Sequence, residues 1–596
     1  MTTFLRLNWF SKVDYREILF DIEKPARYLG GEYNLPEKKG DFAVSCCMAF
    51  PDVYEVGMSN QGLNLLYSIL NDEADCVCER VFAPWTDMAD KLRENGLKLR
   101  SLETARELKS FDILGFSLSY ELAYTTMLYM LDLGGIPFYA KERGEEYPLL
   151  VAGGTCAANP EPFAEFFDII CVGDGEEFII KLKTAVNKHK GNKRKILEEM
   201  RAVEGAYIPL FYGEDANYTV IKTSIVDFEN APYIKKPLVA SLGIVHNRPV
   251  VELYRGCGGG CRFCQAGFLN RPLRFRSKDR VCYLAKNAID TTGADELGLS
   301  SLSTGDYPYI QEAVSELSEY CTQNSVKLQL PSLRLDTFKS EISAMSRISS
   351  LTFAPEAGTQ RLRNVINKNV SDEDIERTMR LAFKQGYKSV KLYFMVGLPT
   401  ETDTDLLGIS KIVDSIKRIY HEEVGNHTLN ITVSTSVFVP KPVTPFEKCA
   451  ALSIAESTRR QRLVRDSLRR FRGVKYNWHE ETASFWECVF ARGGRELSEL
   501  LVTAYKNGCV FDGWNDKFSN AKWFESATEA RIDAEAYIRE YGDNEAMPWS
   551  FIKFPVTSAY LRGEFKKAVT DAVTTRNCLT SGCNACGAQC KTAKTV

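Results

Sequence analysis

The 596-residue sequence contains no apolar run long enough to cross a membrane. A transmembrane helix needs about 20 consecutive apolar residues, and no run here approaches that length. Residues 1–10 lack an apolar segment followed by a small-residue cleavage site, so we expect no secretory signal. A net charge of −3 provides no general attraction to nucleic acid. These absences favour a cytoplasmic protein without a membrane partner.

Histidine is scarce, with 5 residues, whereas cysteine is abundant, with 18. Seven cysteines form two tight clusters, and eleven are scattered, several of them in apolar stretches. Scattered cysteines act as small hydrophobic side chains, whereas clustered cysteines in a reducing cytosol are metal ligands. With 596 residues and 44% hydrophobic content, the chain can form about three or four domains. We therefore expect a cytosolic multidomain enzyme that binds metal.

The first cysteine cluster is Cys257-Gly-Gly-Gly-Cys261-Arg-Phe-Cys264, which follows an apolar strand at 250–254. Thiolates select zinc or iron–sulfur clusters. The next cysteine, Cys282, lies beyond a basic stretch and is not spaced to act as a fourth ligand. Three ligands leave a metal position open for a substrate or cofactor, and the glycines permit tight folding around a bulky cluster. A zinc site or a redox-inert cysteine cluster is the alternative.

This motif, with an aromatic residue before its third cysteine, resembles the signature of the radical SAM enzymes. The resemblance implies a [4Fe–4S] cluster on Cys257, Cys261 and Cys264. Its open iron would bind S-adenosylmethionine (SAM), and its electron would cleave SAM to a 5′-deoxyadenosyl radical. A donor such as flavodoxin or ferredoxin would supply that electron.

Strand–helix repeats after residue 250 have the length expected for a partial (β/α)6 barrel, whose chemistry gathers at the carboxyl ends of its strands. The strands are expected at 250–254, 296–306, 326–334, 350–358, 389–399 and 433–442. By resemblance, the residues near SAM are Phe263, Ser303, Gly305, Asp306, Ser332, Arg334, Glu356 and Gly397. Glu356 could instead cap the helix expected at 359–365.

Four short apolar strands alternate with helices in the first part of the chain, at 42–51, 111–119, 149–155 and 167–177. Such runs, ending in glycine turns, predict a doubly wound parallel sheet. Ligands bind such sheets at the carboxyl ends of the strands.

The series Gly-Gly-x5-Pro-x-Pro, Asp168 and Gly-Asp-Gly-Glu resembles the cobalamin-binding domain that precedes many radical SAM domains. The resemblance implies cobalamin contacts at Gly57, Gly153, Gly154, Gly173, Gly175 and Glu176. The D-x-H-x-x-G motif that supplies a histidine to cobalt is absent, and the matching turn at 54–62 contains no histidine. His189, in a Lys-His-Lys setting, is the one histidine of this domain. Either cobalamin binds without a protein imidazole, or the domain has lost the cofactor.

The second cysteine cluster is Cys578, Cys583, Cys586 and Cys590. Four cysteines within thirteen residues predict a fully ligated metal centre, either zinc or a second iron–sulfur cluster. Two basic stretches, 271–280 and the helix expected at 458–472, could bind RNA or could be a surface loop and a solvated helix.

Residues 20–180, and then most of the chain, resemble an uncharacterised family of radical SAM proteins with a B12-binding domain. The expected fold class is α/β. We expect the parts to be an N-terminal extension (1–40), a Rossmann-like cobalamin-binding domain (41–235), a radical SAM barrel (240–450), an α/β or mostly helical C-terminal extension (451–575) and a Cys-rich metal-binding tail (576–596).

The expected activity is cobalamin-dependent methyl transfer to an unknown substrate, which could be RNA, a peptide or a metabolite. The alternatives are a cobalamin-independent rearrangement, cyclisation or sulfur insertion, and a non-catalytic cobalamin or metal sensor. No catalytic acid or base stands out.

Overall fold

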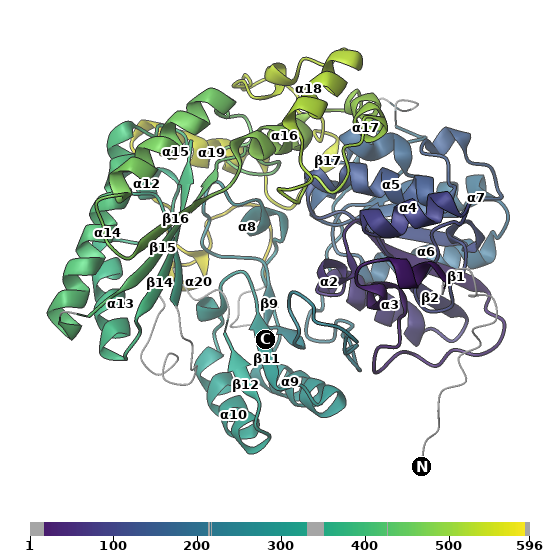
Figure 1. Ribbon diagram of the computed structural model, residues 1–596, viewed down its shortest axis with the longest axis horizontal. Helices are drawn as coiled ribbons and strands as arrows, with labels where there is room; N and C mark the ends of the chain where they lie inside the picture. Colours follow the sequence, from purple (N-terminus) through teal and green to yellow (C-terminus); the bar gives the residue numbers. More distant parts are fainter. Residues whose placement is uncertain (1–16, 213–214, 216, 331–350, 426, 591–596) are drawn as a thin grey trace. The chain divides into compact units, whose positions relative to one another are not determined.

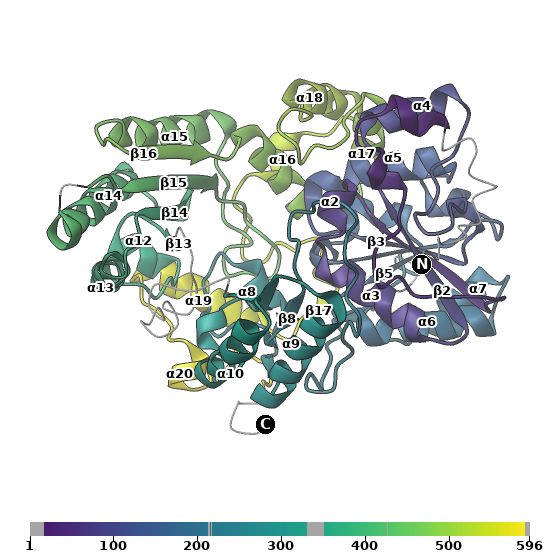
Figure 2. The same cartoon turned by 60° about the horizontal axis from the view of Figure 1, so that its bottom comes forward.

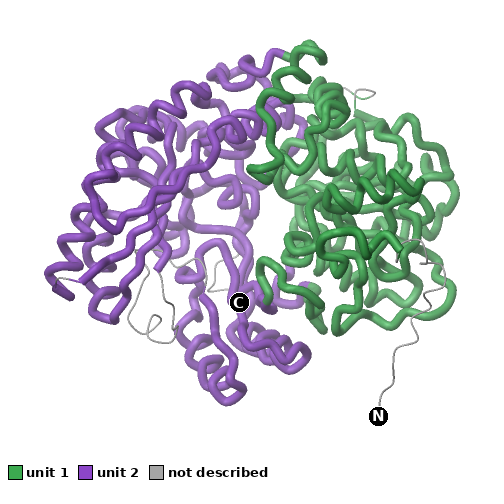
Figure 3. The backbone as a smooth tube through the Cα atoms, viewed as in Figure 1, with its two compact units in different colours: residues 1–225, 232–247, 494–532 green, residues 226–231, 248–493, 533–596 purple. Residues whose placement is uncertain are grey.

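The computed structural model describes residues 17–590, except for 213–214, 216, 331–350 and 426. The chain forms two compact units, each built from segments that are distant in sequence (Figure 3). Unit 1 contains 1–225, 232–247 and 494–532, and unit 2 contains 226–231, 248–493 and 533–596. Parallel strands alternate with helices in both units, which confirms the α/β fold class. No helix among the described residues has the length and apolar character needed to span a membrane.

Unit 1 is built on a six-stranded sheet with the order β2-β1-β3-β4-β5-β6. Its strands are β1 Val44–Phe50, β2 Cys76–Phe82, β3 Ile113–Ser117, β4 Leu149–Gly153, β5 Ile169–Cys171 and β6 Ala206–Tyr207. The first five are parallel, and β6 pairs antiparallel with β5. All seven residues of β1 are buried, as expected for a strand covered on both faces.

Helices cover both faces of this sheet (Figures 1 and 2). They are α2 Tyr54–Gly57, α3 Gln61–Asp72, α4 Thr86–Glu94, α5 Tyr124–Gly134, α6 Glu176–Lys188 and α7 Lys193–Met200. Side chains of α3, α6 and α7 pack against alternate β1 residues, which places these helices on one face. Helices α4 and α5 lie on the other face (Figure 2). The expected doubly wound sheet is therefore present.

Strand β2 was not predicted from the sequence, because Glu79 and Arg80 interrupt its apolar pattern. Both side chains are nevertheless buried. Arg80 forms ion pairs with Glu32 (3.1 Å) and Glu103 (2.6 Å), so that its charge is compensated inside the unit.

Residues 494–532, which we expected in a C-terminal extension, belong to unit 1. This segment contains α17 Leu497–Lys506 and α18 Asn520–Glu529. Helix α17 packs on α5, of which every residue except Asp132 is buried. The Thr125 hydroxyl and the Trp523 indole N–H each donate to the carboxylate of Asp512, at 2.7 and 3.1 Å. The domain boundaries expected from the sequence remain predictions.

Unit 2 contains two parallel sheets with the orders β12-β11-β8 and β13-β14-β15-β16. The strands are β8 Val250–Glu252, β11 Glu296–Ser300, β12 Lys327–Gln329, β13 Leu351–Glu356, β14 Ser389–Val396, β15 Asn430–Val437 and β16 Val474–Trp478. Each of the six strands expected for the barrel is present. Strand β16, within the expected C-terminal extension, adds a further parallel strand beside β15.

Helices alternate with the strands of unit 2, and α13 Asp372–Lys384, α14 Asp403–Val424 and α15 Ile454–Leu468 pack against the β13–β16 sheet (Figure 1). The other helices of unit 2 are α8 Gln265–Leu269, α9 Lys278–Thr292, α10 Ile310–Gln323, α12 Gln360–Val365, α16 Glu481–Arg492, α19 Ser558–Thr570 and α20 Cys578–Ser581. A short hairpin, β9 Tyr254–Arg255 with β10 Arg274–Phe275, flanks the loop that carries the first cysteine cluster.

Candidate functional site

The cysteines of the first cluster lie in the loop between β9 and α8, and each is partly buried. Burial, together with the nearby thiols of Cys261 and Cys257, raises the pKa of Cys264 to about 12, so the three thiols lie close together. The loop turns at Gly256 and Gly260, whose φ values are +96° and +65°. The sequence therefore places three thiols on one tight loop.

Asn367 holds this loop in place, although the sequence analysis did not identify it. Its side chain is fully buried, and its amide donates to the carbonyls of Gly259 (3.3 Å) and Gly260 (2.9 Å). Its amide oxygen accepts from the backbone N–H of Thr575 (2.7 Å), near the C-terminal end of the chain. One side chain thus connects the cysteine loop to the tail.

Arg262, between the second and third cysteines, makes a further connection to the tail. Its fully buried guanidinium donates to Glu564 on α19 (3.0 Å) and to the carbonyl of Val573 (2.6 Å). It also donates to the carbonyl of Val365 (2.9 Å), at the end of α12. This arginine therefore has a structural role within the cysteine motif.

The segment at 303–306 contains a buried polar atom that has no partner. Ser303 is 1% exposed, and its hydroxyl has no hydrogen-bond partner among the described residues. The carbonyl of Ser303 accepts from the Tyr254 hydroxyl (2.6 Å), and Asp306 accepts from the Asn577 amide (3.2 Å). Gly305 lies in the same short 3-10 helix as Asp306. An unpaired buried hydroxyl fits a polar ligand at this strand end.

Glu356 ends β13 in a left-handed conformation, with a φ of +67°. Its carboxylate pairs with Lys368 (3.3 Å), and burial raises its pKa against the opposing effect of that lysine. The alternative role as a helix cap is wrong, because the Thr359 hydroxyl caps α12 by accepting from the Leu362 N–H. A strained residue with a buried charge is typical of ligand sites.

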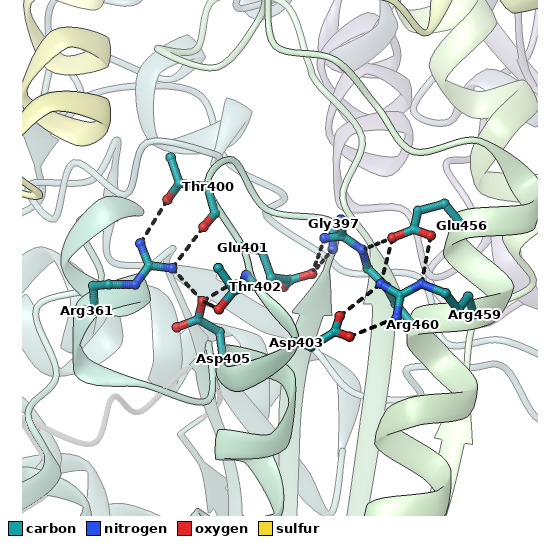
Figure 4. Close-up of polar contacts among 10 residues, drawn as sticks. All are labelled: Arg361, Gly397, Thr400, Glu401, Thr402, Asp403, Asp405, Glu456, Arg459 and Arg460. Atoms are coloured by element: carbon teal, nitrogen blue, oxygen red, sulfur yellow. Dashed lines mark hydrogen bonds and ion pairs between the residues drawn. The ribbon is translucent and has the colours of Figure 1, made fainter.

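Gly397 ends β14 and has a φ of +92°, which favours glycine. Its N–H donates to the buried carboxylate of Glu401 (2.7 Å), which also accepts from Arg460 on α15 (2.9 Å) (Figure 4). Burial raises the pKa of Glu401 to about 7, although the bonds from Gly397 and Arg460 lower it. The β14–α14 turn is therefore held by an arginine of a neighbouring helix.

Several arginines of the two basic stretches are paired or buried. Arg459 pairs with Asp403 and Glu456, and Arg460 with Glu456 and Glu401, as Figure 4 shows. In the other stretch the arginines that follow α8 are buried: Arg271, Arg274 and Arg276. Arg462, Arg469, Arg470 and Arg472 of the helical stretch are nevertheless exposed, so an RNA interface there stays a prediction.

Two of the expected SAM contacts, Ser332 and Arg334, lie outside the described residues. Phe263 packs against the apolar residues that follow β13 and β14. The structure thus brings the cysteine loop, residues 303–306, Glu356 and Gly397 to strand ends of unit 2.

The tail cysteines lie beside the first cluster. Cys578 donates its N–H to the carbonyl of Gly258 (3.2 Å), in the cysteine loop. Cys586 is buried, Cys578 and Cys590 are partly buried, and Cys583 is exposed. In the described part of the chain, no three His, Cys, Asp or Glu side chains converge as a single metal ion requires. An iron–sulfur cluster distributes its thiolates over several irons.

The glycines assigned to cobalamin mostly serve packing. A Cβ at Gly154 would lie 2.4 Å from the Leu118 carbonyl, and a Cβ at Gly173 would lie 2.2 Å from the Thr223 carbonyl. At Gly57 a Cβ would clash with Phe82 at 2.3 Å. Gly153 and Gly175 have looser surroundings, and Glu176 is buried at the start of α6. Close backbone approach within the protein therefore explains three of these glycines.

The structure brings one further histidine into unit 1. The backbone N–H of His246 donates to the Ser59 hydroxyl (3.0 Å), and that of Val245 donates to the Glu55 carbonyl (3.2 Å). Segment 245–246 therefore lies on the turn after β1, where the missing cobalt-binding motif would stand. His189 lies at the opposite end of α6 from the strand ends and contacts Glu199 (2.7 Å).

Residues 251–413 match the family described as "Radical SAM superfamily", and residues 62–209 match "Radical SAM proteins, N-terminal". An uncharacterised protein of Methanocaldococcus jannaschii is 30% identical over 441 residues, which cover 72% of this chain and 90% of the relative. The chain is a radical SAM protein. A [4Fe–4S] cluster and SAM are accordingly its cofactors, and its radical chemistry requires a one-electron reductant.

Further similarities concern other members of the superfamily. A candidate methylthiotransferase of the same archaeon is 27% identical over 329 residues, covering 52% of this chain and 66% of the relative. The solved structure of the radical SAM methyltransferase TsrM from Kitasatospora setae, with cobalamin and a [4Fe–4S] cluster bound, has a TM-score of 0.45 at 13% identity. That comparison covers 66% of this chain and 74% of TsrM. Because radical SAM proteins are enzymes, the alternative of a non-catalytic sensor is wrong.

Proposed function

We propose that this radical SAM enzyme is a cobalamin-dependent methyltransferase, with its radical cluster on Cys257, Cys261 and Cys264. The proposal that cobalamin binds rests on one observation. In unit 1 the order β2-β1-β3-β4-β5 reverses direction between β1 and β3. Doubly wound sheets bind ligands at the carboxyl ends of the strands at such a switch point.

Small exposed residues follow the strands on one side of this switch point. They are Ser119 after β3 and, one strand further along, Gly154 and Thr155 after β4. Small exposed residues leave space for a flat, bulky ligand. When bound, cobalamin would hand a methyl group to the substrate. SAM would be the source of both that methyl group and the radical.

His246 would be the histidine that holds cobalamin, since its backbone is held at the turn after β1. This assignment would supply the imidazole that the sequence motif lacks. His189 provides a matched control, because it contacts Glu199 at the far end of α6.

In unit 2, the chain's own residues would orient SAM. The Ser303 hydroxyl would form a hydrogen bond with SAM, because its oxygen is buried without a partner among the described residues. Glu356 would hold a ribose hydroxyl or the amino group of SAM, and the Gly397 turn would border the adenine. Glu401 and Arg460 would keep that turn closed.

The test is to reconstitute the full chain anaerobically, mix it with hydroxocobalamin and pass it through gel filtration. We expect the corrin absorbance to remain with the protein. When protein labelled with 15N-histidine is reduced to the cob(II)alamin state, the wild type and the His189→Ala variant should show hyperfine splitting from a 15N nucleus in the EPR spectrum. The His246→Ala variant should lose it. Loss of the corrin from wild-type protein would contradict the cobalamin proposal.

A second candidate function is sulfur insertion, which the similarity to a candidate methylthiotransferase favours. The two functions differ in their products. Methyl transfer adds a carbon without sulfur, whereas methylthio transfer adds both. Mass spectrometry of RNA and metabolites from a deletion strain would identify the missing group. A missing group that contains sulfur would favour the second candidate.

A further inference from the structure

We propose that Cys578, Cys583, Cys586 and Cys590 hold a second iron–sulfur cluster next to the radical cluster, with buried Arg271 as its counter-ion. The spacing alone left zinc and iron–sulfur open. Three observations on the tail and its surroundings favour the iron–sulfur cluster.

The first observation is that the tail forms part of the wall around the cysteine loop. A Cβ built on Gly258 would lie 3.3 Å from the sulfur of Cys578 and 2.3 Å from Asn577 Oδ1. The backbone N–H of Leu273 donates to the sulfur of Cys590 (3.1 Å). The sulfur of Cys578 therefore lies beside the cysteine loop, and that of Cys590 accepts a hydrogen bond from the segment after α8.

The second observation is a buried positive charge that lacks a carboxylate. Arg271 is 1% exposed, and within the described ranges its Nε and Nη2 atoms have no hydrogen-bond partner. The thiols of Cys586 and Cys578 and the ring of Tyr560 lie near the guanidinium. A Cβ at Gly260 would lie 3.9 Å from Nη2, so the guanidinium lies between the loop and the tail thiols.

An unpaired buried charge costs several kcal/mol, on the order of the total stability of a domain. With neutral thiols, the charge of Arg271 would be met among the described residues only by uncharged groups, the Phe268 ring and Tyr560. Thiolates bound to iron carry negative charge, which the guanidinium would balance. The arginine therefore indicates that the tail sulfurs are metal-bound thiolates in the working protein.

The third observation favours iron over zinc. The first three tail cysteines have the spacing C-x4-C-x2-C, which plant-type ferredoxins use for a [2Fe–2S] cluster together with a more distant fourth cysteine. Proximity to the radical loop also suits a redox centre. One electron from a ferredoxin- or flavodoxin-type donor would reduce the tail cluster, which would then be reoxidised as it reduces the radical cluster by one electron.

The site is tested on the full chain, reconstituted anaerobically, by its iron, sulfide and zinc content. We expect iron in excess of one [4Fe–4S] cluster and no stoichiometric zinc. The Cys583→Ala/Cys590→Ala variant should lose that excess yet keep the EPR change that SAM causes in the radical cluster. Cys583 is exposed, so this variant is expected to fold, and circular dichroism checks it. Cys282→Ala, which removes a buried cysteine of α9, is the control and should retain both centres.

This proposal rests on the radical cluster at Cys257, so the two are tested separately. A Cys257→Ala/Cys261→Ala/Cys264→Ala variant should lose the response to SAM and keep the tail cluster. Stoichiometric zinc, or an iron content that the tail variant does not change, would overturn the second cluster. Loss of the SAM response in wild-type protein would instead overturn the radical assignment.

The counter-ion role has its own measurement, a redox titration followed by EPR. Arg271→Gln should make the reduction potential of the tail cluster more negative, because a nearby positive charge stabilises the reduced form. Arg271→Lys should shift it less. Arg470→Gln, which removes an exposed arginine after α15, should leave it unchanged. Equal potentials in wild type and Arg271→Gln would overturn this role.

Discussion

At the residue scale, buried charges hold the loops around the radical site. Arg262, Glu401 and Arg460 are all within unit 2, and each has an oppositely charged partner there. A buried charge with a fixed partner resists displacement, because separation would leave both groups uncompensated. Such pairs suit loops that must keep one shape while radicals form.

Glu401 should make stability depend on pH with a definite sign. Burial raises its pKa from 4.5 to about 7, so the stability it contributes is fully present below pH 4.5 and lost as pH rises through 7. The effect is on the order of 3 kcal/mol. Urea unfolding at about pH 5.5 and about pH 8 should show Glu401→Gln gaining stability relative to wild type at the higher pH.

Asp403→Asn is the matched control for this titration. Its carboxylate lies two residues further on, and Arg459 lowers its pKa, so it stays ionised across that window. We expect the difference between this variant and wild type to be the same at both pH values. A constant difference for Glu401→Gln as well would contradict the raised pKa.

Gly397 should be sensitive to substitution for a reason that Gly386 does not share. Both have a positive φ, +92° and +90°, but a Cβ at Gly397 would meet Leu452 at 2.8 Å, whereas a Cβ at Gly386 has open space. Gly386→Ala should cost about 1 kcal/mol of unfolding free energy, and Gly397→Ala should cost more because of the contact with Leu452. SAM affinity, measured by equilibrium dialysis, should fall about tenfold in Gly397→Ala alone. Equal affinities in the two variants would exclude a role for this turn in binding SAM.

At the scale of elements, α19 acts as a support for the cysteine loop. Glu564, 1% exposed on this helix, pairs with Arg262 of the loop, and the segment after the helix bonds to Asn367. The loop itself is rich in glycine and has little rigidity of its own. Support from a later element supplies that rigidity.

Breaking the buried pair should therefore destabilise the protein strongly. Arg262→Met or Glu564→Met should each cost about 3–5 kcal/mol, because the remaining charge is left buried. The loss of unfolding free energy in the double variant should be smaller than the sum of the losses in the two single variants. Lys567→Met is the control, since Lys567 pairs with the same carboxylate but is 47% exposed, and it should cost about 1 kcal/mol or less. Additive costs, measured by denaturant unfolding, would mean that the pair is not coupled.

At the scale of the whole molecule, neither unit is a continuous stretch of sequence. The chain leaves unit 2 after residue 493 to complete unit 1 and returns at 533. Helix α17 covers α5, whose side chains Met127, Leu128 and Leu131 are fully buried. Without α17 the apolar surface of α5 would be exposed, and exposed apolar patches lead to aggregation.

A fragment of residues 1–247 should therefore be insoluble when expressed alone. Joining residues 494–532 to it through a flexible linker should restore solubility, because α17 again covers α5. Gel filtration and circular dichroism of the two fragments provide the measurement. A soluble, folded 1–247 fragment would show that the later segment is not needed.

The sequence by itself determined the chemistry of this protein, because the features responsible are local. The C-x3-C-x2-C motif lies within eight residues, and apolar strands alternating with helices predict parallel sheets. Buried charges concealed one strand, β2, since its arginine is compensated by Glu32 and Glu103 from distant segments.

Only the tertiary structure decided which distant residues serve the site. Asn367 meets Thr575 across 208 positions, and Arg262 meets Glu564 across 302. It likewise placed His246 at the turn after β1, Arg271 beside the tail thiols and residues 494–532 in unit 1. Sequence periodicity reports which face of an element is apolar, but it does not report which partner covers that face. The partner is chosen by packing and charge compensation over the whole chain.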